Sequence, residues 1–532
     1  MKSIVKFQII FSIVFLVGLT KVAGDNLPEQ VHLAIGRDAS TMVVSWVTMA
    51  PTMLPIVKYG TSALTHGTLG DTTDFEYNGV HRYIHTVTID NLDPSTIYSL
   101  THGTLGDTVD FEYNGVHRYI HTVTIDNLDP STIYYYKVGS GDGMSKKIYQ
   151  FQSFPKGNNF SLRVCAFGDL GYLNGTSIPY LIQAAERGDF DMIIHIGDIA
   201  YDLHTDNGER GDLYMKELEP LFSRVPYMVI AGNHEDDGKN FSHYQNRFKM
   251  PGLDNQFYSF DLGAVHFVGV STEYYGFFYE YGQQPVFNQY NWLSNDLQKA
   301  NQNRANIPWI ISYQHRPFYC SNDNSVECRS FENWLVRTGY EEMPGLEKLF
   351  IENGMDIGFW GHEHSYERFY PVANRTLFIE NGMDIGFWGH EHSYERFYPV
   401  ANRTVYNDGM HPYKNAAAPT YIISGSAGCH TPKASFGPPN PASAFRSDDF
   451  GYTLMTVYNQ THIHLEQISV EKAGVIDDIW VIKDKGYRMT AKSRPSIKFP
   501  PAIYQENCSA RDHRCRQEFE IRKRVSEKGF AM

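Results

Sequence analysis

Five apolar stretches each run directly into a polar cluster, and this pattern constrains the fold of the chain most. The stretches read LRVCAFGD, DMIIHIGD, PYMVIAGNH, IPWIISYQH and MDIGFWGH. Helical stretches such as IPYLIQAAERG and FNQYNWLSNDLQKAN lie between them. Alternating buried strands and helices predict an α/β fold. Sites in such folds form beyond the carboxyl ends of strands, which is where all five clusters fall.

The five clusters offer a set of metal ligands. A single Gly-Asp after a strand is more often a turn or a helix cap, and a single histidine is more often structural. Five successive clusters of this kind instead indicate a metal site. The seven candidate ligands are Asp169, Asp198, Tyr201, Asn233, His315, His362 and His364.

The ligand types narrow the choice of metal. Carboxylates, an amide, a phenol and imidazoles suit hard-to-borderline ions rather than thiolate sites. Seven ligands are too many for one ion, so we expect two ions that share an aspartate. A phenolate from Tyr201 would favour Fe(III). The alternative for Tyr201 is a packing aromatic at the start of a helix.

Two segments of the chain are duplicated. Residues 349–376 recur unchanged as 377–404, which repeats the histidine pair as His390 and His392. Residues 64–98 recur as 100–134, with Thr73 against Val109 as the one difference. Solenoid repeats drift in sequence and tile a region. We therefore interpret these copies as recent exon-scale duplications or as an error in the gene model.

We predict that the first histidine pair, His362 and His364, holds the metals. The stretch YEEMPGLEKLFIENG is typical of one helix that leads into the strand MDIGFWGH. The extra residues 377–404 then fall in a surface loop, where insertions cost little. A native second copy would interrupt that helix. The second copy does join the downstream strand PTYIISGSAG directly, so His390 and His392 stay open as the alternative pair.

The N-terminal part has a different texture. Residues 25–155 are predicted to form an all-β module, because TMVVSWVT and YIHTVTID are typical of strands. The spacing of Pro130 and Tyr134 is similar to a tyrosine corner in a sandwich of the fibronectin type III kind. The duplicate at Pro94 and Tyr98 would add strands or a bulging loop. Residues 161–484 form the predicted catalytic domain, and 485–532 form a tail.

The first 24 residues are typical of a secretory signal peptide: a basic start, a short apolar run and small residues before a cleavage site. The run is too short for a membrane anchor, and the polar, basic C-terminus does not fit a lipid-anchor signal. We therefore expect a secreted protein, either extracellular or lysosomal, without a stable membrane anchor.

Other features agree with an oxidising compartment. Two close cysteine pairs are disulfide candidates, whereas Cys165 lies in an apolar strand and is expected to be a buried thiol. The paired cysteines are Cys320 with Cys328 and Cys508 with Cys515. The candidate N-glycosylation sites are Asn159, Asn174, Asn240, Asn374, Asn402, Asn459 and Asn507. The net charge of −14 argues against nucleic acid as a partner.

The motif series GDLG, GDIAY, GNHE, YQH and GHEH resembles the purple acid phosphatases, within the binuclear metallophosphoesterases. The resemblance covers nearly the whole mature chain. It implies a β-sandwich followed by an α/β domain, with two mixed sheets packed face to face and flanked by helices. It also implies a secreted acid phosphatase that acts on small phosphate esters. Most relatives carry Asp-x-His at the first motif, whereas this chain has Asp169-Leu-Gly171 and supplies Tyr201.

The resemblance also implies a role for each candidate. Asp169, Tyr201 and His364 would bind Fe(III), and Asn233, His315 and His362 would bind a divalent Fe, Zn or Mn ion. Asp198 would bridge the two ions, and His234 would lie beside the substrate phosphate. Two cations polarise the phosphoryl oxygens and lower the pKa of a bound water, so that hydroxide attacks phosphorus in line.

One departure from the family pattern affects proton transfer. Relatives usually carry a further histidine in the loop after His315, but RPFYCSNDNSVECRSFENW contains none. Protonation of the leaving group then depends on His234 or a bound water. Two alternatives to a phosphomonoesterase stay open: a phosphodiesterase or nucleotide pyrophosphatase on the same site, and a catalytically weak glycoprotein with a binding role. A homodimer is compatible with the sequence.

Overall fold

The computed structural model of the chain divides into two compact units. The first comprises Met1–Lys156 with Met215–Pro226, and the second comprises Gly157–Tyr214 with Tyr227–Met532. The structure describes residues 27–52, 54–61, 71–77, 80–86, 102–140, 143–173, 175–252, 255–316, 331–353, 355, 357–360, 385–388, 394–398, 400–401, 404–406, 411–415, 420–424, 427–428, 443–447, 449–485 and 496–498.

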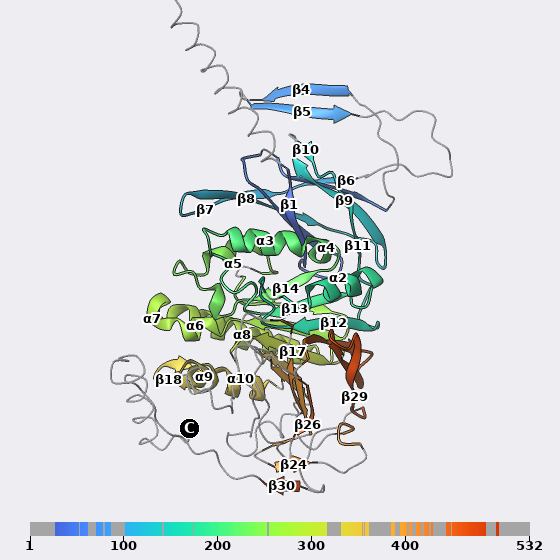
Figure 1. Cartoon of the computed structure of the whole chain (residues 1–532), viewed down its shortest axis with the longest axis vertical. Helices are drawn as coiled ribbons and strands as arrows, with labels where there is room; N and C mark the ends of the chain where they lie inside the picture. The colour runs from blue at the N-terminus through green and yellow to red at the C-terminus, as the bar shows by residue number, and fades with distance from the viewer. Residues whose placement is uncertain are drawn as a thin grey trace, which may run out of the picture. The chain divides into compact units, whose positions relative to one another are not determined.

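Two antiparallel sheets make up most of the first unit (blue to cyan in Figure 1). One sheet has the order β1-β2-β8-β7, with bounds Glu29–Ile35, Met42–Thr48, Val116–Ile125 and Asp107–Tyr113. The other has the order β10-β9-β3-β6, with bounds Gly143–Met144, Ile133–Ser140, Ile56–Gly60 and His102–Leu105. Strand β11 (Tyr149–Gln152) pairs with β9.

The sandwich forms because its strands place alternate apolar side chains on a shared core. Trp46 of β2 and Tyr136 of β9 are fully buried in that core. The hydroxyl of Tyr134 accepts a hydrogen bond from the backbone N–H of Asp129 at 2.9 Å. This confirms the predicted tyrosine corner, in which the phenol bonds to backbone a few residues upstream.

The duplicated N-terminal segment adds strands. Strands β4 (Asp71–Tyr77) and β5 (Val80–Thr86) form a two-stranded sheet of their own. Its register repeats that of the β7–β8 hairpin, with Tyr77 opposite Val80 as Tyr113 is opposite Val116. Of the two expectations for this copy, the structure confirms extra strands.

A segment from the middle of the chain belongs to the first unit. Helix α4 (Glu219–Phe222) contacts β1, and Glu219 accepts hydrogen bonds from the Val31 N–H at 3.3 Å and from the Tyr149 hydroxyl at 3.1 Å. The Tyr136 hydroxyl donates to the Ser223 carbonyl at 2.7 Å. The predicted boundaries assign these residues to the 161–484 domain, so the chain passes between the units more often than the sequence indicates.

The second unit contains two mixed sheets. The six-stranded sheet has the order β14-β13-β12-β27-β28-β29, with bounds Tyr227–Ile230, Met192–Ile196, Leu162–Phe167, Gly451–Val457, His462–Ser469 and Gly474–Ile482. The eight-stranded sheet has the order β15-β16-β17-β20-β21-β25-β22-β26, with bounds Tyr258–Leu262, Val265–Val270, Trp309–Gln314, Ile357–Trp360, Ile385–Trp388, Thr420–Ser424, Tyr394–Phe397 and Ser443–Ser447. The Tyr258 hydroxyl donates to the Val229 carbonyl at 2.6 Å and so joins the two sheets. The predicted pair of mixed sheets is confirmed.

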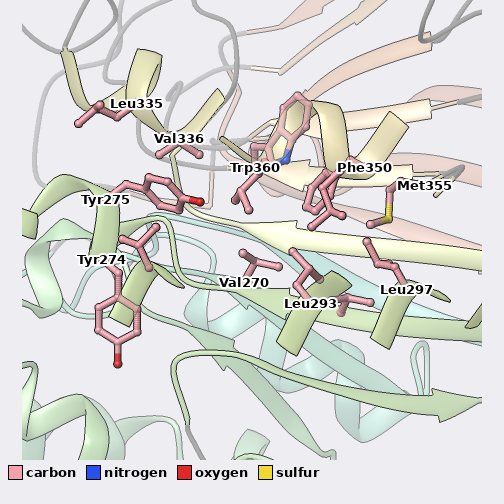
Figure 2. Close-up of a cluster of buried hydrophobic side chains, with 14 of the residues drawn as sticks. Val270, Tyr274, Tyr275, Leu293, Leu297, Leu335, Val336, Phe350, Met355 and Trp360 are labelled. Carbon is pink, nitrogen blue, oxygen red and sulfur yellow. The ribbon is translucent and has the colours of Figure 1, made fainter. Parts of the chain in front are cut away.

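Helices cover the eight-stranded sheet through one large apolar cluster. Helix α8 (Gln284–Gln302) has a proline in its first turn and buries Leu293 and Leu297, spaced four residues apart on one face. Figure 2 shows these side chains meeting residues from β16, α6, α9, α10 and β20, among them Val270, Phe350 and Trp360. The predicted helices over IPYLIQAAERG and FNQYNWLSNDLQKAN are both present, the first as α2 (Ile178–Arg187).

The remaining elements are short and lie in the second unit, except for the last residues of α3, which belong to the first. They are α3 (Glu209–Glu217), η1 (Asn233–Glu235), α5 (Ser242–Arg247), α6 (Glu273–Gly276), α7 (Phe278–Tyr281), α9 (Phe331–Thr338), β18 (Gly339–Tyr340), β19 (Met343–Pro344), α10 (Leu346–Glu352), β23 (Val400–Ala401), β24 (Thr404–Tyr406) and β30 (Ser496–Lys498). The helix expected over YEEMPGLEKLFIENG is shorter than predicted, because β19 pairs with β18 and the helix begins only at Leu346.

We predicted that the second copy of the GHEH segment lies in a surface loop, and this prediction is wrong. Its IGFW stretch forms β21, which pairs in parallel with β20 from the first copy, with Ile357 opposite Ile385 and Trp360 opposite Trp388. Its YERF stretch forms β22. An apolar, strand-forming stretch can pair in register with its own copy, because both copies have the same preference for a strand.

The structure describes some of the secretion-related candidates. Cys165 is buried and free, as predicted. The sequon residues Asn159, Asn240 and Asn459 are exposed. The signal segment and the remaining candidates lie outside the described residues: Cys320, Cys328, Cys508, Cys515, Asn174, Asn374, Asn402 and Asn507. Every helix in the described part of the chain is too short or too polar to span a bilayer.

A buried histidine links three elements of the second unit and generates a prediction. His266 of β16 lies 2.6 Å from Asp261 of β15 and 2.9 Å from Asp296 of α8. Burial lowers its pKa, but the two carboxylates outweigh burial and raise the pKa from 6.5 to about 9. A raised folded-state pKa stabilises the fold fully below pH 6.5, and this contribution is lost as the pH rises through about 9.

We expect the thermal unfolding midpoint of the wild type to decrease as the pH rises from 6.5 to 9. The free energy of unfolding should lose a contribution on the order of 2 kcal/mol from His266 over this range. His266→Gln should flatten that part of the profile, whereas His462→Gln, on a surface strand, should leave it unchanged. Thermal unfolding at both pH values measures the difference. A variant His266→Gln with the wild-type slope would contradict the assignment.

Candidate metal centre

Residues from both sheets of the second unit come together at the carboxyl ends of the strands. Asp169 follows β12, Asp198 follows β13, Asn233 follows β14 and His315 follows β17. One ligand atom each from Asp169, Asp198 and His315 lies within 4.8 Å of the others, and all three residues are buried. The structure thus brings His315 together with two candidate ligands that lie more than a hundred residues earlier in the sequence.

The backbone at three of the candidates is strained. Asp169, Asp198 and Tyr201 have φ angles of 58°, 50° and 50°, in the left-handed region that residues other than glycine seldom adopt. Such conformations cluster at functional sites, where the surrounding structure over-determines them. The two Gly-Asp turns therefore aim their carboxylates into one place.

The ring of His315 is oriented by a bond between the two sheets. Its Nδ1 donates to the Ile196 carbonyl of β13 at 2.8 Å, because a carbonyl can only accept. Its Nε2 then lies 3.1 Å from Asn233 Oδ1 and 3.3 Å from Asp198 Oδ1. A metal-binding histidine typically donates its other N–H in this way. A cation beside Nε2 fits this group of acceptor atoms.

Asp198 lies at the centre of the constellation. Its Oδ1 also accepts the backbone N–H of His234 at 3.1 Å. Burial disfavours the charged carboxylate, but the nearby imidazoles of His315 and His234 outweigh burial and hold the pKa of Asp198 below its usual range. Burial lowers the pKa of His315, but the charge of Asp198 and its contact with the ring outweigh burial and raise that pKa to about 10.

A buried carboxylate ties the two central loops together. Glu235 accepts backbone hydrogen bonds from Asp198 at 2.9 Å, Ile199 at 2.9 Å and Gly232 at 2.8 Å. Burial and the charge of Asp198 raise its pKa. The sequence alone indicated no role for Glu235. Its place within the GNHE motif was the one available signal.

Tyr201 is buried, and its ring fills the space beside Gly171. A Cβ on Gly171 would lie 3.2 Å from Tyr201 Cδ2, and Gly171 has a φ of 70°. A larger residue there would therefore meet both strain and the tyrosine ring. This explains why the first motif of this chain reads Asp169-Leu-Gly171. The ring of Tyr201 also lies 4.6 Å from the ring of His234.

His234 faces a carboxylate that sequence analysis missed. Its Nδ1 lies 2.9 Å from Asp202 Oδ1, and Arg210 lies 3.9 Å from the other carboxylate oxygen. Burial lowers the pKa of His234, but Asp198 and Asp202 outweigh it and raise the pKa to about 9. Asp202 directly follows Tyr201, and nothing in its spacing signalled the contact.

Comparison with known proteins identifies the family. The chain is 39% identical over 470 residues to "Acid phosphatase type 7" of Homo sapiens, covering 86% of this chain and 91% of that protein. The chain belongs to the purple acid phosphatase family. It is also 37% identical to "Acid phosphatase type 7" of Danio rerio, over 86% of this chain and 92% of the other.

Family profiles cover most of this purple acid phosphatase. The profile "Calcineurin-like phosphoesterase" matches residues 162–366, and "Iron/zinc purple acid phosphatase-like protein C" matches 418–478. "Purple acid Phosphatase, N-terminal domain" matches twice, at 28–110 and 99–153, as expected of a duplicated segment. The family assignment makes the protein an acid phosphatase.

A solved structure shares this fold. A purple acid phosphatase from seeds of yellow lupin, Lupinus luteus, superimposes with a TM-score of 0.61 at 22% identity, covering 90% of this chain and 78% of that one. The match supports the arrangement of an N-terminal domain followed by a phosphoesterase domain.

A buried ion pair holds the chain just after His315. Arg316 donates through Nε to Glu273 of α6 at 2.9 Å, and its backbone N–H donates to the Thr272 hydroxyl at 2.7 Å. Both charged side chains are almost completely inaccessible to solvent. Removing one partner of such a buried pair strongly destabilises a protein. The pair therefore fixes the position of His315 at the end of β17. Glu273 lies in an aromatic stretch that carried no sequence signal for this role.

The two histidine pairs, His362 with His364 and His390 with His392, lie outside the described residues. The strands that precede them are described. Strand β20 of the first copy pairs directly with β17, with Trp360 opposite Gln314, whereas β21 of the second copy lies one strand further away. Adjacent strands are about 4.8 Å apart. This arrangement supports the prediction that the first pair is the one beside His315.

We expect the double variant His362→Ala with His364→Ala to lose bound metal and phosphatase activity. The variant His390→Ala with His392→Ala should keep both, because its strand is not a neighbour of β17. Metal content per chain and hydrolysis of an aryl phosphate measure the two effects. The reverse pattern would mean that the second copy supplies the ligands.

Proposed function

We propose that this acid phosphatase hydrolyses phosphate monoesters at a binuclear Fe(III)–M(II) centre, with Fe, Zn or Mn as the divalent ion. The observation that supports this most is the position of Asp198. Its carboxylate shares one buried cluster with Asp169 and His315, and its Oδ1 lies 3.3 Å from His315 Nε2. Two ions that share a ligand require one carboxylate between their two sets of ligands, and Asp198 has this position.

The donor set fits two unlike ions. Asp169 and Tyr201 supply hard anionic oxygens, which suit Fe(III), and the amide of Asn233 with the imidazole of His315 suits a divalent ion. His362 and His364 would complete the two sets. When bound, the ions supply charge neutralisation at the phosphoryl oxygens and lower the pKa of water to make a nucleophile.

Residues of the chain orient the substrate and supply a proton to its leaving group. Since Asp202 accepts a hydrogen bond from Nδ1 of His234, the Nε2 of that ring is the atom left to donate to a phosphoryl or leaving-group oxygen. The side chain of His234 retains 30% of its exposure, so a substrate can reach it. We therefore propose that His234 protonates the leaving group, because the loop after His315 contains no histidine.

We further propose that the enzyme is secreted and glycosylated and that its substrates are small phosphate esters. The N-terminal segment supports secretion, and the exposure of Asn159, Asn240 and Asn459 is compatible with glycan attachment. Purified, metal-loaded protein that turns over an aryl phosphate monoester faster than a diester would support this function. Faster turnover of the diester would favour the phosphodiesterase alternative, and turnover of neither would favour the binding glycoprotein.

The variant Tyr201→Phe tests the proposal that Tyr201 binds Fe(III). A phenolate on Fe(III) produces a charge-transfer band in visible light, which a phenylalanine ring cannot produce. We expect the variant to lose its visible absorption while the far-ultraviolet circular dichroism stays unchanged. Tyr180→Phe, an exposed tyrosine on α2, is the matched control and should keep the colour. An oxidised wild type that binds two metals and is colourless would contradict the assignment.

A further inference from the structure

Two acidic side chains lie directly opposite each other on the outer strands of the six-stranded sheet. Glu466 of β28 and Asp478 of β29 are cross-strand partners. Like charges at directly opposite positions destabilise a strand pair. A cation between them would remove that repulsion, so the pair calls for an explanation.

A histidine completes a three-ligand cluster at this position. His464 Nε2 lies 2.9 Å from Asp478 Oδ2, and His464 Nδ1 lies 3.6 Å from Glu466 Oε2. One ligand atom from each of the three residues lies within 4.8 Å of the others. Ligands of a tetrahedral zinc ion, bound at about 2.0–2.2 Å, lie roughly 3.3 Å apart, so Asp478 is already close to that spacing from Nε2, whereas the Glu466 carboxylate has to rotate toward it.

The imidazole is fixed in orientation before any ligand arrives. Trp480 is the cross-strand partner of His464, and their rings stack at 4.4 Å with an interplanar angle of 15°. Trp480 is itself stacked against the ring of Tyr458, with 5.1 Å between the ring centroids. The carboxylates of Glu466 and Asp478 retain 30% and 54% of their exposure, so an ion can enter from solvent.

We propose that His464, Glu466 and Asp478 bind a divalent transition-metal ion, zinc being the best match, separate from the catalytic centre. One imidazole with two carboxylates is a ligand set that zinc accepts in proteins. The ion would take Nε2 of His464 in place of its contact with Asp478, together with one oxygen from Asp478 and one from Glu466, whose carboxylate would rotate from the Nδ1 side to the Nε2 side of the ring. It would neutralise the opposed acids and brace the β28–β29 edge of the sheet.

Zinc counting on the full-length protein tests this proposal. Wild type, His464→Gln and Asp478→Asn are equilibrated with Zn²⁺, passed through a desalting column and analysed for zinc per chain by mass spectrometry. We expect each variant to hold one ion fewer than wild type, with unchanged phosphatase activity. His462→Gln, two residues away on the same strand, is the matched control and should hold as many ions as wild type.

Two results would overturn the proposal. One is an equal zinc count in wild type and Asp478→Asn, a variant that keeps the stacked pair of His464 and Trp480 and so decides the matter even if His464→Gln folds poorly. The other is an equal loss of zinc in His462→Gln, which would trace the effect to the strand pair as a whole.

Discussion

Three hydrogen bonds to one buried carboxylate hold the centre of this enzyme together. Glu235 accepts the backbone N–H groups of Asp198, Ile199 and Gly232, and so joins the loops that follow β13 and β14. Removing this acceptor would leave buried donors unsatisfied, at about 1–3 kcal/mol each. The left-handed backbone of Asp198 is tolerable because its N–H is secured in this way. Every ligand distance that involves Asp198 depends on that loop.

The site also depends on the contact between the two sheets of the second unit. His315 comes from β17 of the eight-stranded sheet, yet its Nδ1 bonds to Ile196 of the six-stranded sheet. That bond directs Nε2 toward Asp198 and Asn233. Neither sheet alone presents a complete set of ligands. Packing of the sheets is therefore part of the chemistry, while the Arg316–Glu273 pair fixes the chain just after His315.

The sequence predicted the strands and the ligand types because both follow from short-range patterns. Apolar runs that end in polar clusters became β12, β13, β14, β17 and β20. Contacts between distant segments could not be predicted from the sequence. The Asp202–His234 pair, the role of Glu235 and the fit of Gly171 against Tyr201 depend on how loops meet in space. The second IGFW copy was wrongly placed in a loop, since a loop-cost argument ignores that identical strands pair well.

We propose that Asp198 is shared by two metal ions. The most direct test compares the metal content of wild type, Asp198→Asn and Asp202→Asn, the last being an aspartate of the same loop that contacts His234 rather than the ligand cluster. A shared Asp198 predicts two ions in wild type and in Asp202→Asn. It predicts loss of at least one ion from Asp198→Asn, with activity falling by more than the ~100-fold typical of outer-shell changes. Two bound ions and normal turnover in Asp198→Asn would contradict it.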